Sequence, residues 1–126
     1  YGPILEEING KKVTSLYKTF ADCRNLIVAP QLPSNTLHLN GTFVNCVSLI
    51  DASSIVIPNT IKHMGNGANE GTFENCINLK YAPNIPATVS KMDQAFGNCT
   101  SLVEMPTIPN KFDKAVVFAG CTQFGY

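Results

Sequence analysis

The sequence has little charge and no excess of either sign. Its 126 residues include nine basic and nine acidic side chains, and charged residues make up only 14% of the chain. Proteins that bind nucleic acid or anionic membranes usually carry a basic excess that neutralises phosphate groups. The balance therefore gives no electrostatic support to a nucleic-acid or membrane-surface partner.

Long apolar runs are also missing. No run approaches the roughly 20 residues that span a bilayer, and no basic stretch followed by an apolar segment marks a secretory signal. Eight prolines and nine glycines favour many short elements and turns over long helices. We expect one domain over residues 1–126, with no membrane insertion.

Residues that commonly carry out chemistry are few and scattered. His38 and His63 are the only histidines, and no two carboxylates have a spacing typical of a general acid and base. The segment 65–67 has two glycines but no following Lys-Ser/Thr, so a phosphate loop is not indicated. The sequence contains no C-x₂-C pair, the ligand spacing that is typical of a zinc site. We therefore predict no catalytic residue, no metal and no cofactor, and a protein that is not an enzyme.

What the chain does contain is one segment in five copies. Each copy has a Phe, then a Cys three positions later, then a Leu three positions after that, except that the fifth copy ends in Phe124. Self-similarity at this period is typical of a solenoid, in which each coil buries its apolar side against its neighbours. The sequence predicts a β-rich α/β solenoid of about five coils. The cysteines, which are 23, 30, 23 and 22 residues apart, are Cys23, Cys46, Cys76, Cys99 and Cys121.

Within each copy, apolar residues return at about every third position. Around Phe-x-x-Cys this spacing predicts one face of a short helical segment, held by packing. A short parallel strand is expected at each Leu-x-x-Ala, limited by the prolines that follow, and a second at Val89–Met92 and its equivalents. The residue before each Cys should end the helix in a turn or left-handed conformation. These residues are Asp22, Asn45, Asn75, Asn98 and Gly120.

The copies differ in length at defined places. The first copy has an irregular start at residues 4–12. The third contains two extra residues near Ser53–Val56 and five more in Gly65–Gly71. Insertions in solenoids map to loops, so we expect a glycine-rich bulge at one corner. The fifth copy is one residue short.

The five cysteines fall at one position of the repeat, which predicts a structural column of buried thiols. Neighbouring sulfurs should lie close, because parallel strands are about 4.8 Å apart. Stacked side chains share a direction, however, and this disfavours disulfide geometry. Metal or redox roles remain the alternatives.

The repeat resembles a known family. The third and fourth copies read Leu79-x-x-Ala82-Pro83-x-Ile85-Pro86-x-x-Val89-x-x-Met92-x-x-Ala95-Phe96-x-x-Cys99. This is similar to the BspA-like leucine-rich repeats, also called the Treponema pallidum type, from about Val13 to Phe124. The resemblance implies a curved, non-catalytic solenoid on bacterial or protist surface proteins, with an extracellular or cell-surface location and a protein or glycan ligand. Similar arrays also occur in larger bacterial and phage proteins.

Two outward surfaces are candidate binding sites. One is a basic ridge beside the inward residues, interpreted either as a solvated edge or as a pH-sensitive contact strip. The other is a recognition face along the Leu-x-x-Ala segments, with Tyr81 as an amphipathic anchor; an ordinary exposed sheet is the alternative. Exposed Ile27, Ile50 and Val103 would favour recognition if they form one patch. The ridge is His38, His63, Lys91 and Lys114, and the face is Gln31, Asp51, Tyr81, Asn84, Glu104 and Thr107.

These features predict a binding module of adhesion type within a larger surface-exposed protein, and the alternative is a structural spacer in a fibre or virion. The chain begins at Tyr1 rather than Met and stops directly after its fifth copy. Since solenoids need polar caps for solubility, we expect either a fragment or self-association through this end.

Overall fold

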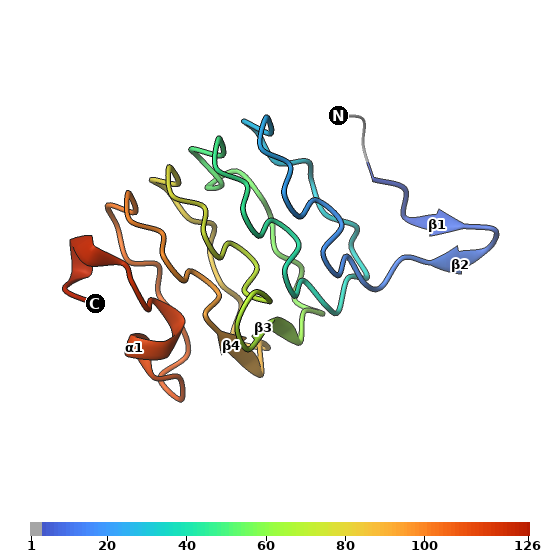
Figure 1. The fold of residues 1–126 in the computed structure, drawn as a ribbon. Coiled ribbons are helices and arrows are strands. Elements are labelled where there is room, and N and C mark those ends of the chain that lie inside the picture. The colour runs from blue at the N-terminus through green and yellow to red at the C-terminus, as the bar shows by residue number, and fades with distance from the viewer. Residues whose placement is uncertain (1–3) are drawn as a thin grey trace.

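The computed structural model describes residues 4–126. The chain winds through successive turns that lie side by side, and the polypeptide advances steadily from one end of the stack to the other (Figure 1). Most described residues lie in turns and loops. The regular elements are β1 (Glu7–Ile8), β2 (Lys11–Lys12), β3 (His63–Asn66), β4 (Lys91–Asp93), α1 (Lys114–Val117) and the 3-10 helix η1 (Thr122–Phe124).

The first copy begins with a β-hairpin rather than the irregular segment expected. Strands β1 and β2 pair antiparallel, with Glu7 opposite Lys12, and the hairpin projects from the end of the stack (Figure 1). Asn9 and Gly10 connect them with φ angles of 52° and 79°. Two positive φ angles define the turn that suits a two-residue hairpin, and Asn-Gly is its preferred sequence.

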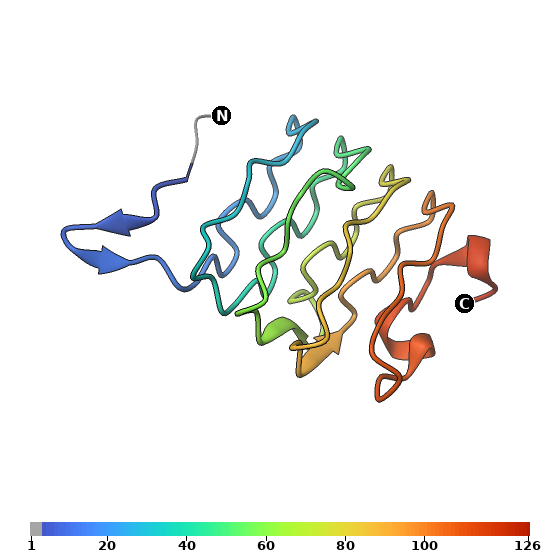
Figure 2. The same cartoon turned by 180° about the vertical axis from the view of Figure 1, so that it is seen from behind.

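The parallel pairing lies at the second of the two expected strand positions. Ser15 bridges to His38 and His38 to His63, and β3 then pairs with β4 through His63 and Lys91. Figure 2 shows β3 and β4 next to each other along one edge of the stack. The Leu-x-x-Ala segments, expected to form the main ladder, contribute a single bridge between Asp51 and Tyr81 within residues 4–126. Proline after most of these segments removes a ladder donor, which explains the difference.

The prediction of helical Phe-x-x-Cys segments was wrong, because these residues form consecutive turns. In the first copy the N–H groups of Ala21 and Cys23 donate to carbonyls three residues back. Those of Phe20 and Asp22 donate instead to Thr42 and Val44 of the next copy. In an α-helix, successive N–H groups beyond the first turn all bond to carbonyls of the same segment. Alternate donors are used between copies here, so the helix cannot propagate.

The residue before each Cys has the left-handed conformation that the sequence predicts. Its φ is 60° at Asp22, 62° at Asn45 and Asn75, 58° at Asn98 and 79° at Gly120. The side chains also form a ladder along the stack. The Nδ2 groups of the second, third and fourth copies donate to Oδ1 of the preceding copy at 2.7, 2.9 and 2.8 Å. The position therefore ends one turn and joins neighbouring copies.

A continuous column of phenylalanine rings fills the interior. Neighbouring rings are nearly parallel, with centroids 5.4–5.6 Å apart. Phe124 packs edge-on against Phe118, the last ring, at 5.8 Å. Around the column lie Leu, Ile, Val and Met side chains of all five copies, most of them fully buried. The stacked rings are Phe20, Phe43, Phe73, Phe96 and Phe118.

The five cysteines are free and lie beside this column. Cys23 is half-buried and the other four are buried. Each of these four donates its S–H to the carbonyl of the Phe in the preceding copy, at 3.0–3.2 Å. A thiol is a small apolar group with a weak donor, so it satisfies a buried carbonyl where no larger polar group would fit. Burial raises the pKa of Cys46 to about 11 and also raises that of Cys76.

The five-residue insertion is held against the next copy at two glycines. A side chain at Gly65 or Gly71 would collide with the backbone carbonyl of Asp93 or Gln94. The buried carboxylate of Glu74 then accepts hydrogen bonds from the N–H groups of residues 69 and 71, at 3.0 and 3.1 Å. The insertion is thus an ordered loop with its own anchor.

Candidate functional site

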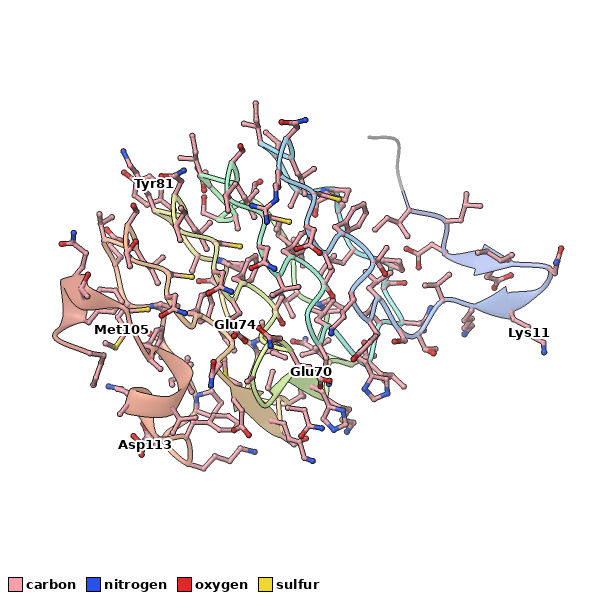
Figure 3. All side chains as sticks on the ribbon, viewed as in Figure 1. Lys11, Glu70, Glu74, Tyr81, Met105 and Asp113 are labelled. Atoms are coloured by element: carbon pink, nitrogen blue, oxygen red, sulfur yellow. The ribbon has the colours of Figure 1, made fainter. Side chains whose placement is uncertain are left out.

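A hollow of about 430 Å³ opens between the fourth and fifth copies, beside Ser53 of the third. Its apolar lining residues are Ala82, Pro83, Met105 and Pro106. Figure 3 labels Tyr81 and Met105, which both line it, in the half of the stack away from the hairpin that carries Lys11. The polar residues around the hollow are Ser53, Tyr81, Asn84, Glu104 and Thr107.

Four of the six residues predicted for the recognition face line this hollow. The repeat explains why they meet. Tyr81 and Glu104 occupy one position of the repeat, and Asn84 and Thr107 another, between two prolines. Adjacent stacked copies place equivalent residues side by side. Tyr81 remains 43% exposed, so its ring is accessible from solvent.

Asp51 borders the hollow rather than lining it. It pairs with Tyr81 in the parallel bridge. Its Oδ1 accepts from the hydroxyl of Ser53 at 2.6 Å and from the N–H of Ser53 at 2.8 Å. The hydroxyl and then the backbone bond lower the pKa of Asp51. This carboxylate therefore fixes the orientation of Ser53 at the rim.

Gln31, the sixth predicted residue, lies away from the hollow. Its amide donates to the carbonyl of Ser54 at 3.2 Å and accepts from the N–H of Val56 at 3.4 Å. Gln31 therefore holds the two-residue insertion of the third copy in place. The recognition face that the sequence predicts is not one continuous row.

The same insertion builds a second, smaller hollow that sequence reasoning missed. It measures about 240 Å³ and shares Ser53 and Asn84 with the first. Its other lining residues include Ile85 and Val56, which is 71% exposed. The sequence feature that could have indicated this hollow is the two extra residues near 53–56. The result is a polar hollow with an apolar extension.

The apolar residues singled out from the sequence do not all gather in one hollow. Ile27 and Ile50 line a third hollow of about 420 Å³ with three polar residues. Val103, which is 51% exposed, does not line it. The hollow at Tyr81 therefore remains the better candidate, because both its aromatic anchor and its polar groups come together.

The predicted basic ridge is present over three of its four residues. His38, His63 and Lys91 follow one another in the parallel ladder. The imidazole rings of His38 and His63 stack, with centroids 4.8 Å apart and Nδ1 atoms 2.9 Å apart. Lys114 lies instead in α1, because Asp113 caps a helix by accepting from the N–H of Ala115 at 2.9 Å.

Burial lowers the pKa of His63, and the charges of His38 and of nearby lysines lower it further. Over residues 4–126, no group of three or more His, Cys, Asp or Glu side chains is arranged to hold a metal ion. No helix in the same range is long and apolar enough to cross a bilayer.

The stacked copies, their short parallel bridges and their buried Leu and Phe columns define a leucine-rich-repeat fold. Two solved structures share it over 95% of this chain. A leucine-rich repeat protein from Bacteroides ovatus has a TM-score of 0.54 at 24% identity. The T. pallidum leucine-rich repeat protein has a TM-score of 0.53 at 20% identity.

The similarity to Treponema pallidum-type repeats that the motif predicts is therefore confirmed at the level of the fold. The chain spans 36% of the Bacteroides ovatus protein and 64% of the T. pallidum protein. No protein-family model and no curated protein sequence matches it.

Proposed function

We propose that this chain is a non-catalytic binding module, a leucine-rich-repeat solenoid of about five coils that presents the hollow between its fourth and fifth copies to a protein or glycan ligand. The observation that carries the proposal is the gathering of Tyr81, Asn84, Glu104 and Thr107 around one concavity. Concave sites that combine apolar side chains with convergent polar groups are where proteins usually bind ligands.

The rest of the fold supports this function by keeping the hollow rigid. The phenylalanine column, the amide ladder and the thiol hydrogen bonds all run from copy to copy. A preformed surface loses little conformational entropy when a ligand binds. Binding can therefore be strong enough to be useful even though the hollow is small.

We further propose that the module belongs to a bacterial or phage protein exposed at the cell surface or outside the cell, and acts in adhesion. Family resemblance supports this location. Protease treatment of intact cells that make the full-length protein tests it. Cleavage of the repeat before lysis is expected, and full protection until lysis would contradict the location.

A structural spacer is the second candidate, favoured by the same continuous ladders, which suit a rod that transmits force. In that role the chain could self-associate through its last copy. Sedimentation velocity separates these states, because end-to-end association gives a sedimentation coefficient that rises with concentration.

The binding function is tested with a triple variant, Asp51→Ala, Tyr81→Ala and Glu104→Ala, on a panel of purified matrix glycoproteins and whole cells. Capture by the native chain and its loss in the variant are expected. The matched control is Lys11→Ala with Lys12→Ala, which removes charge from the distant hairpin (Figure 3). Equal capture by both variants would favour the spacer.

A further inference from the structure

Most of the polar side chains around the hollow have no hydrogen-bond partner among residues 4–126, and Ser53 is the exception. Over residues 4–126, the side chains of Asn84, Glu104 and Thr107 make no hydrogen bond to another residue, and neither does the hydroxyl of Tyr81. Elsewhere in the structure, polar side chains form hydrogen bonds along the ladders and to the insertions. These four groups are therefore free to bond with a ligand.

Their chemistry favours a ligand that both donates and accepts. The amide of Asn84 does both, as do the hydroxyls of Thr107 and Tyr81, while Glu104 only accepts. Ser53 donates its hydroxyl proton to Asp51 and so offers its remaining lone pairs as an acceptor. No described residue that lines the hollow is cationic. A sulfated or phosphorylated ligand would find no counter-charge there and would meet the carboxylate of Glu104.

The volume of the hollow and its apolar surfaces further restrict the class of ligand. A volume of about 430 Å³ lies within the range of roughly 300–1,000 Å³ that is typical of small-ligand sites. The carbonyl of Tyr81 is not free for an added peptide strand, because it accepts the N–H of Ala52 at 2.8 Å. The exposed Tyr81 ring offers a flat apolar face beside polar groups.

We infer that the hollow between the fourth and fifth copies takes a neutral saccharide unit, whose C–H face packs on the ring of Tyr81 while its hydroxyls bond to Asn84, Glu104 and Thr107. This inference rests on the proposed binding function and names the ligand class. The neighbouring apolar hollow, reached past Ser53 and Asn84, fits the methyl of an N-acetyl group on an adjoining sugar unit.

The test is saturation-transfer difference NMR on the full chain with three neutral probes: methyl β-D-galactopyranoside, methyl α-D-mannopyranoside and diacetylchitobiose. The peptide Ala-Lys-Ala-Arg-Ala is the competing probe, because Glu104 could also attract a cation. Saturation of the ring C–H protons of at least one saccharide is expected. Tyr81→Ala should weaken that binding by about tenfold or more, as losing a central aromatic anchor does.

Two further variants make the result specific. Thr107→Val keeps the shape and removes one hydroxyl, so saccharide affinity should fall several-fold. Tyr17→Phe removes a hydroxyl that bonds to Glu70 at 3.0 Å, away from the hollow, and should leave the affinity unchanged. Each variant is first checked for native stability by urea unfolding.

Saccharide binding that survives Tyr81→Ala would overturn the inference, and so would the absence of binding by all three saccharides. Peptide binding that depends on Tyr81 and Glu104, without saccharide binding, would overturn the saccharide class and leave the proposed binding function intact. Failure of the binding function itself appears separately, as equal capture by the triple and hairpin variants on the glycoprotein panel.

Discussion

The Nδ1 atoms of His38 and His63 lie 2.9 Å apart in the parallel ladder. At this distance one ring must donate its proton to the other, because two protonated nitrogens would repel and two bare lone pairs would not bond. The positive charges of Lys62 and Lys91 also act on His63. Burial and these neighbouring charges therefore disfavour the protonated form of His63.

The first prediction concerns pH. The pKa of His63 is lowered in the folded protein by burial and by its charged neighbours, whereas in the unfolded chain it is about 6.5. Between these two values the unfolded chain binds more protons, so stability falls as pH decreases through about 6.5. Urea midpoints should be lower at pH 5.5 than at pH 7.5, and His63→Gln should flatten the difference.

This pH window separates the histidines from the carboxylates. The hydroxyl and N–H of Ser34 lower the pKa of Glu6, and Ser53 lowers that of Asp51, so both titrate well below pH 5.5. Lys111 is not among the charges that lower the pKa of His63, so Lys111→Gln is the control and should keep the native slope. A slope that persists in His63→Gln would contradict the role of the pair.

The second prediction concerns the phenylalanine column. Phe73 is 1% exposed and stacks on Phe43 at 5.5 Å and on Phe96 at 5.4 Å. Phe73→Ala should therefore cost about 3–5 kcal/mol of unfolding free energy, as cavity formation in a packed core does. Phe112→Ala, at a half-buried ring outside the column, should cost clearly less. Equal losses of unfolding free energy in the two variants would show that the column rings contribute no more to stability than a half-buried ring.

The third prediction concerns thiol reactivity. The thiolate is the reactive form, and burial raises the pKa of both Cys46 and Cys76. Cys23 is half-buried and the other four cysteines are buried, so only Cys23 should be accessible for rapid reaction with iodoacetamide at pH 8 in the native protein. Mass spectrometry should find one fast label, with the remaining cysteines labelled at the rate of unfolding. Fast native labelling of Cys76 would show that the thiols are not enclosed by neighbouring copies.

The fourth prediction separates backbone conformation from side-chain bonding at Asn75. This residue has a φ of 62°, donates to Asn45 at 2.9 Å and accepts from Asn98 at 2.8 Å. Asn75→Gly loses the two hydrogen bonds and keeps the left-handed conformation. Asn75→Ala loses the two hydrogen bonds and also disfavours the left-handed conformation. It should therefore be less stable than Asn75→Gly by about 1–2 kcal/mol. Equal stabilities in urea would show that the conformation carries no strain.

How far the sequence could predict this structure depended on the type of signal. An apolar residue at every third position fits neither a long helix nor a strand. It fits a coil that turns several corners and points one residue inward on each side, and this predicted that Phe and Cys lie in the interior. The Asp, Asn or Gly before each Cys predicted its left-handed turn correctly. Both signals are local, and each is repeated in every copy.

The errors arose where hydrogen bonds between copies decide the outcome. The i, i+3 pattern around Phe20 suits a helix, yet alternate N–H groups bond to the next copy and leave consecutive turns. The hairpin at Asn9 and Gly10 has a recognisable turn signal, but it lies before the first repeat and has no equivalent in the other copies. Lys114 is not part of the ridge, because the fifth copy is one residue short and has a capped helix at this position.

The candidate site was predictable in its residues but not in its shape. Tyr81 and Glu104 could be brought together from their repeat positions alone. The grouping of Gln31 with them was not supported, because its amide binds the insertion at Ser54 and Val56. How an insertion displaces neighbouring chain depends on packing that periodicity does not encode.

The most direct test of the whole account is an NMR measurement of NOEs between aromatic protons of selectively labelled Phe43, Phe73 and Phe96. Rings with centroids about 5.5 Å apart should give strong NOEs from Phe43 to Phe73 and from Phe73 to Phe96, with none from Phe43 to Phe96. Absence of the two neighbouring NOEs, or a contact that skips Phe73, would contradict the stacking of consecutive copies around a shared interior.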